Sequence, residues 1–388
     1  MTSGPLSAVR VLEFAGKGPV PFAAMVLAGL GADVLRIDRL PRPRRHADYR
    51  PETDLLQLGR PSVALDLRSA DGLALAKDLL RRADVLVEGY RPGVMERLGL
   101  GPAEVAGLNP GLVYGRATGW GQSGPLAAAA GHDINYLALS GVLHLLGRAG
   151  EPPTPPANLL ADFGGGGMLL AMGVLAGLAG RSASGRGTVV DAAMLDGATQ
   201  LATLLFGLRA GGMWSDERGT NLLDTGAPYY DVYRTADDGW IAVGAVEPVF
   251  FERLVTTLGL RDDPACASPA DRATWPAMRA RFTEVFGMRT RDEWVKVFAG
   301  VDACVTPVLT PEEAAAHPHN QARGLYRENA GVLHPAVAPR FAHLGEDTAE
   351  AEVSAVSAVD ILAALRAWGV PDSRLDELQA SGSVEPGA

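Results

Sequence analysis

Short apolar runs alternate with longer amphipathic segments through the first 120 residues of the chain. The short runs have strand length and the longer segments have helical spacing. Strand and helix repeated in this order predict right-handed crossovers and a parallel, Rossmann-like sheet of the α/β class. The expected strands are 9–14, 33–38, 63–67, 84–88 and 112–116, and the expected helices between them are 21–31, 72–83 and 93–98.

The pattern changes near Asp224. Residues 229–235 and 240–246 alternate in polarity around the turn 236–239, which predicts a β-hairpin. We therefore expect a large Rossmann-like domain, a linker and a smaller α+β domain. These are 1–200 with 332–388, 201–223, and 224–331. The remaining predicted helices are 168–179, 191–209, 249–259, 275–298 with a break near Gly287, and 359–368.

Composition and charge limit the classes of partner and the cellular setting that the chain is expected to have. With 47% apolar residues the chain can bury a sizeable core, and its net charge of −10 argues against nucleic acid as a partner. Cys266 and Cys304 make no disulfide framework, and neither end carries a recognisable signal, so we expect a cytoplasmic protein. Residues 163–180 approach membrane-spanning length, but they are rich in Gly and Ala, which favours a packed helix over membrane insertion.

Most of the candidate catalytic residues lie between Gly131 and Gly167. His132 precedes an Asp, and Asp162 precedes four glycines, so two groups could exchange protons near neutrality. A core histidine and a helix N-cap aspartate are the plainer alternatives. The four glycines are poor helix formers, and they favour a backbone that approaches a ligand closely.

Two further stretches have plain alternatives. Glu247 follows a predicted strand and precedes a proline, and an exposed turn residue is its default interpretation. The first βα turn, 15–22, has Gly16 and Gly18 but lacks the third glycine of a dinucleotide fingerprint. Prolines at 19 and 21 also remove backbone donors, which argues against a nicotinamide or flavin site.

Taken together, the motifs resemble the CaiB/BaiF superfamily, or family III CoA-transferases, over nearly the whole chain. Within it, His132 in GHDINY and Glu247 in GAVEP resemble the α-methylacyl-CoA racemase branch. The stretches that carry the resemblance are 27–38, 63–67, 84–98, 118–124, 131–136, 160–166, 189–197, 226–233, 244–248 and 302–309.

The resemblance implies a chemistry and an assembly. It implies an isomerase that inverts C2 of 2-methyl-branched acyl-CoA thioesters by two-base proton transfer through an enolate. His132, oriented by Glu247, would serve one face of the carbon and Asp162 the other. We expect the Asp162 backbone N–H to meet the enolate oxygen. An interlocked homodimer is implied, with no membrane insertion.

The resemblance also implies positions for CoA, which is part of the substrate, and it implies no metal or other cofactor. The CoA phosphates and adenine would meet loops at the carboxyl ends of the strands, and Gly131 to Tyr136 would lie along the pantetheine. The implied CoA-binding residues are Arg39, Arg60, Leu65, Asp66, Leu67, Arg68, Gly89, Tyr90, Arg91, Arg97, Gly131, Asp133, Ile134, Asn135 and Tyr136.

Two alternatives stay open. A family III CoA-transferase would use Asp162 as a covalent nucleophile. His132, Glu247 and the absence of a second Gly-rich loop near 218–226 argue for the racemase instead. A non-catalytic CoA-binding protein would keep the fold without the chemistry.

Overall fold

The computed structural model describes residues 4–40, 50–342, 361–380 and 384–386. The chain forms two compact units. The first is built from 1–140, 156–201 and 324–388, and the second from 141–155 and 202–323. The second unit is thus larger than the small domain expected at 224–331, because it also includes 141–155 and 202–223.

A seven-stranded sheet organises the first unit, in the order β12-β3-β2-β1-β4-β5-β6. Six strands are parallel: the five that were predicted, and β6, which was not; β12 is antiparallel to β3. The strands are β1 (Arg10–Phe14), β2 (Asp33–Arg39), β3 (Ser62–Leu65), β4 (Val85–Glu88), β5 (Val113–Thr118), β6 (Val189–Ala193) and β12 (Val384–Pro386).

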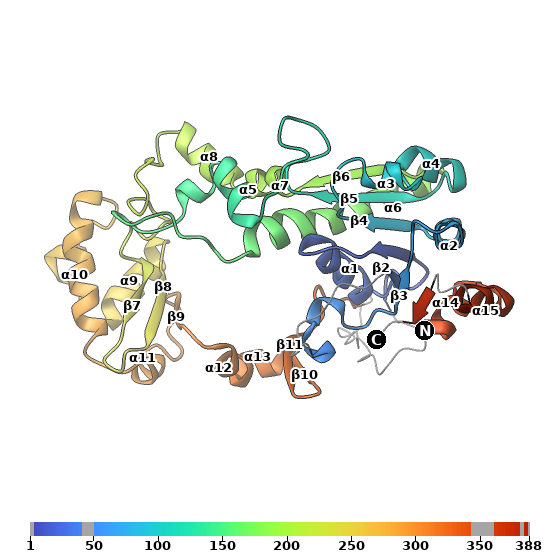
Figure 1. The fold of residues 1–388 in the computed structure, drawn as a ribbon. Helices are drawn as coiled ribbons and strands as arrows, with labels where there is room; N and C mark the ends of the chain where they lie inside the picture. Colours follow the sequence, from blue (N-terminus) through green and yellow to red (C-terminus); the bar gives the residue numbers. More distant parts are fainter. Residues whose placement is uncertain (1–3, 41–49, 343–360, 381–383, 387–388) are drawn as a thin grey trace. The chain divides into compact units, whose positions relative to one another are not determined.

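Alternate strand residues serve two different cores because side chains point to opposite faces of a sheet. Val11 of β1 packs in one core and the adjacent Leu12 in the other. Helices therefore cover both faces of the sheet (Figure 1). On one face lie α1 (Pro19–Gly29) and α6 (Leu169–Ser184); on the other lie α2 (Ala70–Leu80), α4 (Pro102–Leu108), α14 (Ile361–Ala367) and α15 (Asp372–Ala380).

The helix predicted at 191–209 is wrong at its start. Residues Val189–Ala193 form β6, which pairs with β5 so that Ala192 lies beside Ala117. Two helices follow, α7 (Met194–Leu201) and α8 (Thr203–Ala210). The apolar run into α7 has no period that separates strand from helix, and pairing with β5 decides the outcome.

The glycines after Asp162 lie inside a helix. Residues Leu159–Met168 form a π-helix, with Asn158 as its N-cap, so Asp162 is not the cap residue. A Cβ on Gly165 would lie 2.6 Å from the backbone N of Ala198, and one on Gly197 of α7 would lie 1.9 Å from the carbonyl oxygen of Gly165. Close helix packing, rather than approach to a ligand, therefore requires glycine at 165.

One described helix, Leu159–Ser184, is long and apolar enough to cross a membrane by length and composition alone, and 39% of its most apolar window is buried. Its buried side includes Leu170 and Val174, whereas Met168 and Met172 are exposed. The predicted packed helix therefore has one packed face and one exposed apolar face.

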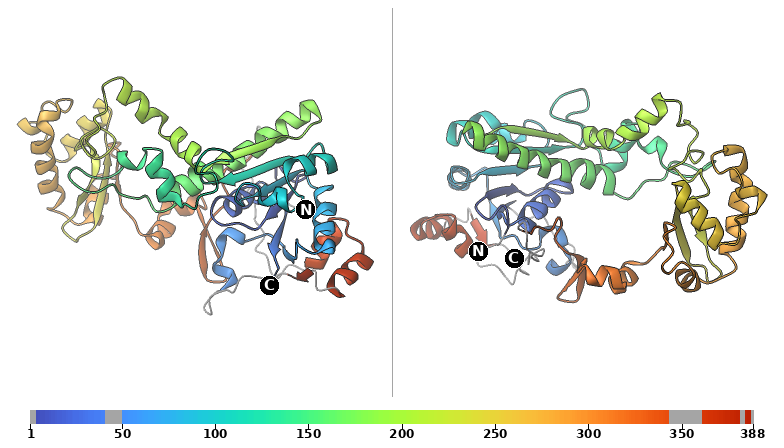
Figure 2. Two further views of the ribbon diagram at one scale, coloured as in Figure 1. Left: turned by 45° about the horizontal axis from the view of Figure 1, so that its top comes forward. Right: turned by 180° about the vertical axis from the view of Figure 1, so that it is seen from behind.

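The second unit contains the predicted hairpin. β7 (Tyr230–Arg234) pairs with β8 (Trp240–Gly244) in antiparallel fashion, and β9 (Val305–Pro307) adds a third strand. Three helices, α9 (Pro248–Thr257), α10 (Trp275–Phe286) and α11 (Arg291–Val297), belong to the same unit as this sheet (Figure 2). Their buried side chains form one core with it.

The remaining described elements are short. The helices are α3 (Val94–Arg97), α5 (Asp133–Leu139), α12 (Pro311–Ala316) and α13 (Pro318–Ala322), with 3₁₀ turns at Pro51–Thr53, Leu55–Gln57, Leu143–Leu145, Pro264–Cys266 and Arg272–Thr274, and β10 (Tyr326–Asn329) and β11 (Val332–Pro335) form a hairpin.

The contact between Gly165 and Gly197 gives the first prediction. Gly197→Ala should lower the free energy of unfolding by about 1–3 kcal/mol, because the new methyl group overlaps the Gly165 carbonyl. Gly180→Ala in α6 is the matched control, since a Cβ there meets nothing within 4 Å. Urea denaturation of both variants measures the difference, and equal stabilities would contradict the packing argument.

Candidate active site

Loops after successive parallel strands meet at one edge of the first unit's sheet. Gly18 follows β1, Arg39 ends β2, Asp66 follows β3, Tyr90 follows β4 and Trp120 follows β5. In open α/β sheets the carboxyl edge is where ligands bind, because loops from several strands converge there. The candidate site is built on this edge.

His132 lies at the start of α5, reached through the loop that follows β5. It is the N-cap residue of α5, and its backbone N–H donates to Oδ1 of Asn135 at 3.0 Å. Tyr136 holds the same turn in place: its hydroxyl donates to the Gly131 carbonyl, and its ring packs edge-on against Trp120. The His132 side chain is exposed at this anchored turn.

Asp162 lies half-buried in the first turn of the π-helix. The Asn158 side chain donates to its Oδ2 at 3.3 Å, and a Cβ on Gly18, whose φ is +64°, would lie 3.4 Å from the same oxygen. Stacking of Phe22 on Phe163, with centroids 4.8 Å apart, holds this turn against α1.

The structure brings His132 and Asp162 into electrostatic range of each other. Burial raises the pKa of Asp162, Asn158 lowers it through the hydrogen bond, Asp133 raises it and His132 lowers it. A carboxyl group with a raised pKa beside an imidazole is suited to general acid–base chemistry. The exposed His132 side chain rules out the alternative of a core histidine.

Two expectations at this turn need correction. The Asp162 N–H donates to Oδ2 of Asp133 at 2.8 Å, so it is engaged within the protein and is not directed at a ligand oxygen. The Asp133 side chain is only 4% exposed and also accepts from the Ala161 N–H at 2.7 Å. Its carboxylate therefore does not line a ligand channel; it binds the start of the π-helix.

Glu247 belongs to the second unit. It is the exposed N-cap residue of α9, and its carbonyl accepts from Phe250 and Phe251. Its carboxylate makes no side-chain capping bond, and its charge raises the pKa of the Cys304 thiol, after the larger effect of burial. The side chain is therefore exposed, as the default interpretation has it.

The predicted CoA-binding residues differ in exposure. Arg39, Arg68, Arg91 and Arg97 are exposed at or after the ends of β2, β3 and β4, where basic groups can meet phosphates. Ile134 and Asn135 are exposed on α5; Leu65 and Tyr136 are buried, and Asp66, Leu67, Gly89, Tyr90 and Gly131 lie between or at the surface.

Arg60 is the exception among the predicted arginines. Its side chain is fully buried, and Nε donates to Oε2 of Glu13 at 2.9 Å. Glu13, also buried, pairs with Arg36 of β2 on its other oxygen. The Arg60 guanidinium thus balances a buried carboxylate and is not presented to a phosphate, which corrects the expectation.

A second buried ion pair shapes the loop after β4. Glu88 accepts from Arg116 at 2.8 Å and from the backbone N–H of Tyr90 at 2.7 Å. Arg116 extends the network to Glu96 of α3. Burial raises the pKa of Glu88, and its two partners act in the opposite direction. The bond to Tyr90 fixes the turn at residues 89–91.

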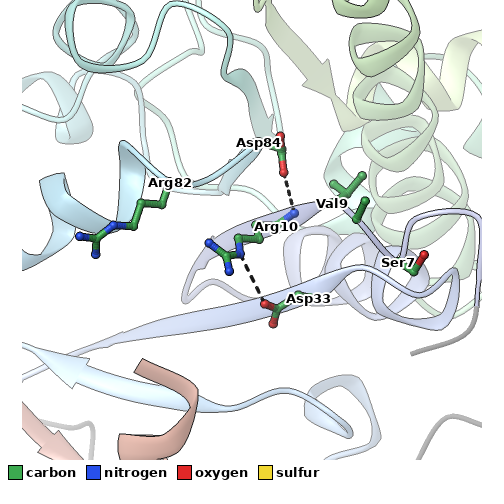
Figure 3. A pocket seen from close by; sticks show the side chains of 7 residues that line it. Ser7, Val9, Arg10, Asp33, Arg82 and Asp84 are labelled. Carbon is green, nitrogen blue, oxygen red and sulfur yellow. Dashed lines mark hydrogen bonds and ion pairs between the residues drawn. The ribbon is translucent and has the colours of Figure 1, made fainter. Parts of the chain in front are cut away.

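A different hollow lies at the amino edge of the same sheet (Figure 3). Its volume is about 450 Å³, and the Asp84 carboxylate within it accepts from the Arg10 backbone while Asp33 pairs with the Arg10 side chain. These charges satisfy one another, so the hollow is not the candidate site.

Across residues 4–40, 50–342, 361–380 and 384–386, no group of three His, Cys, Asp or Glu is placed to hold a metal.

Sequence reasoning missed Asn158 and Trp120. Asn158 stands four residues before Asp162, a spacing that shares one helix face, so a helix assigned from Leu159 would have indicated it. Trp120 supports the α5 turn from the loop after β5, and the sequence carries no signal for that contact.

These features define an α/β protein with a histidine and an aspartate in electrostatic range of each other at the carboxyl edge of its sheet. The sequence pattern of CoA-transferase family III matches residues 6–352. The chain is 48% identical over 323 residues to the alpha-methylacyl-CoA racemase of Mus musculus, covering 83% of this chain and 82% of the relative. The Homo sapiens alpha-methylacyl-CoA racemase is 47% identical over the same shares of both chains.

A solved structure shares the fold. A CAIB/BAIF family protein from Brucella suis superposes with a TM-score of 0.78 at 24% identity, over 94% of this chain and 99% of that one. The family pattern and the racemase relatives extend the likeness to the sequence. The chain therefore belongs to CoA-transferase family III.

The assignment of Arg60 can be tested through stability. Arg60→Met should lower the free energy of unfolding by about 3–5 kcal/mol, because Glu13 loses one partner of a buried pair. The exposed Arg39→Ala should change it by less than about 0.5 kcal/mol. Urea denaturation compares the two, and a stable Arg60→Met with weakened acyl-CoA binding would restore the phosphate role.

Proposed function

We propose that the chain is an isomerase that racemises C2 of 2-methyl-branched acyl-CoA thioesters. The observation that supports the proposal is that His132 and Asp162 lie in electrostatic range of each other at the carboxyl edge of the sheet. The α-proton is acidified by the thioester carbonyl, and inversion needs a base on each face of the carbon. One group removes the proton and the other returns one, through an enolate.

Stabilisation of the enolate is assigned to the start of α5. Its first N–H groups, those of Asp133 and Ile134, have no acceptor within the helix, and they adjoin His132. Backbone donors fixed in place stabilise developing negative charge without reorganising. This assignment replaces the Asp162 N–H, which the Asp133 carboxylate occupies.

The roles proposed for Glu247 and for the CoA-binding residues rest on the family resemblance. Glu247 would orient His132 and keep it basic, from the second unit of the same or a neighbouring chain. The exposed arginines 39, 68, 91 and 97 would meet the CoA phosphates. An interlocked homodimer is part of the proposal, and the exposed apolar side chains of Met168, Met172 and Leu201 support it.

The first test is exchange of the α-proton. With (2S)-2-methylacyl-CoA in D₂O, proton NMR should show loss of the α-proton signal and appearance of the 2R epimer. Asp162→Asn should reduce this rate by about 10²–10⁴-fold, because one base is lost. The exposed Asp196→Asn of α7 is the matched control and should keep the wild-type rate.

The same experiment separates the transferase alternative. His132→Ala should abolish exchange under the proposal, but it should spare CoA transfer to an added carboxylate if Asp162 is a nucleophile. Transfer without α-proton exchange in the wild-type protein would overturn the racemase assignment.

The raised pKa of Asp162 predicts the pH dependence. Protonating Asp162 while His132 is also protonated leaves no base, so kcat/KM should fall as pH falls through the raised pKa. The midpoint should lie above the ordinary aspartate value of about 3.9. Both enantiomers should show the same profile, because their kcat/KM ratio equals a pH-independent equilibrium constant. Circular dichroism checks folding at each pH, and a limb at or below 3.9 would contradict the proposal.

A further inference from the structure

One buried carboxylate connects the two elements that carry the proposed bases. Oδ2 of Asp133 accepts from the backbone N–H of Ala161 at 2.7 Å and of Asp162 at 2.8 Å. Asp133 follows His132 directly in the chain and is 28–29 residues from the two residues whose N–H groups donate to it. The first N–H groups of a helix lack internal acceptors, and a carboxylate is well suited to satisfy them.

We propose that Asp133 is a positioning residue that fixes the position of Asp162 relative to His132. This inference rests on the proposed function. The covalent neighbour of one base holds the backbone of the other, so a single residue, Asp133, and its hydrogen bond to the Asp162 N–H connect His132 to Asp162. A displacement of the π-helix start would move Asp162 away from its face of the substrate carbon.

The charge of Asp133 also acts on Asp162. It raises the pKa of Asp162 beyond the effect of burial, whereas His132 and Asn158 lower it. Tyr136 of α5 also faces Asp162 electrostatically. Asp133 is thus the carboxylate that acts on Asp162 at close range.

The other elements packed on the π-helix add little charge near Asp162. Helix α1 has no titratable side chain, and the one in α7, Asp196, is exposed. The charged groups of the other packed elements are engaged elsewhere or exposed: Arg181 of α6 pairs with Asp84, Arg116 of β5 with Glu88 and Glu96, and Asp191 of β6 accepts from the Gln122 N–H.

Two substitutions separate the geometric role from the electrostatic one. Asp133→Asn keeps an oxygen acceptor and removes the charge, whereas Asp133→Ala removes both. Hydrogen–deuterium exchange mass spectrometry of peptides covering Leu159–Met168 should show at least roughly tenfold faster exchange at the helix start in Asp133→Ala, and near wild-type protection in Asp133→Asn. Asp196→Asn, which removes an exposed charge from a helix packed on the same segment, is the matched control and should leave exchange unchanged.

Kinetics supply the second measurement. Asp133→Ala should lose about 100-fold in kcat with little change in KM, because Asp162 is misplaced by a fraction of its contact distance. Asp133→Asn should retain most of kcat but move the acidic limb of the kcat/KM profile to lower pH, because a like charge is gone. A merely structural role would not move that limb.

The outcomes separate the two proposals. Unchanged peptide exchange in Asp133→Ala, or an unmoved acidic limb in a folded Asp133→Asn, would overturn the positioning role. If Asp133→Ala does not fold, the limb of Asp133→Asn still decides. If the wild-type protein exchanges no α-proton, the proposed function fails, while peptide exchange still tests whether Asp133 holds the start of the π-helix.

Discussion

The contact between Gly165 and Gly197 is the constraint on which the site depends. The Gly165 carbonyl oxygen lies where a side chain at position 197 of α7 would have to be, so the two backbones pack directly on each other. A Cβ on Gly166 or Gly167 would likewise lie within about 3 Å of Pro19 or Phe22. Helices α7 and α1 thus fix the middle of the π-helix, and the Asp133 carboxylate holds its first turn, where Asp162 lies.

Buried ion pairs fix the loops at the carboxyl edge of the sheet. Glu13 with Arg36 and Arg60, and Glu88 with Arg116, place ionised groups near the carboxyl ends of β1 and β4. A buried pair contributes little net stability, but the loss of one partner leaves an uncompensated charge. Such pairs therefore fix loop geometry: Glu88 holds the Tyr90 turn, and Arg60 donates to the Leu56 carbonyl of the second 3₁₀ turn.

The sequence was sufficient for the parallel sheet because β1 to β5 are buried on both faces and read as continuous apolar runs. It failed at β6, whose first residues are exposed and whose apolar run continues into α7. The π-helix also escaped prediction, since its hydrogen-bond spacing leaves no periodic signature and a run of glycines argues against any helix. His132 and Asp162 were identified by residue type and family motif, whereas the roles of Asp133 and Arg60 depend on which way each side chain points.

That last difference bears on how acid–base sites are inferred. Asp133 and Asp162 are both aspartates within stretches that carry the family resemblance, but they differ in burial and in what their carboxylates contact. Asp162 keeps one oxygen toward Asn158 and the Gly18 turn and remains half-exposed, so its proton can be exchanged. Asp133 is buried, and one of its oxygens accepts from two backbone N–H groups, so its side chain holds the start of the π-helix. Residue type alone therefore does not identify an acid–base group, because burial and hydrogen-bond partners give these two aspartates different roles at the same turn.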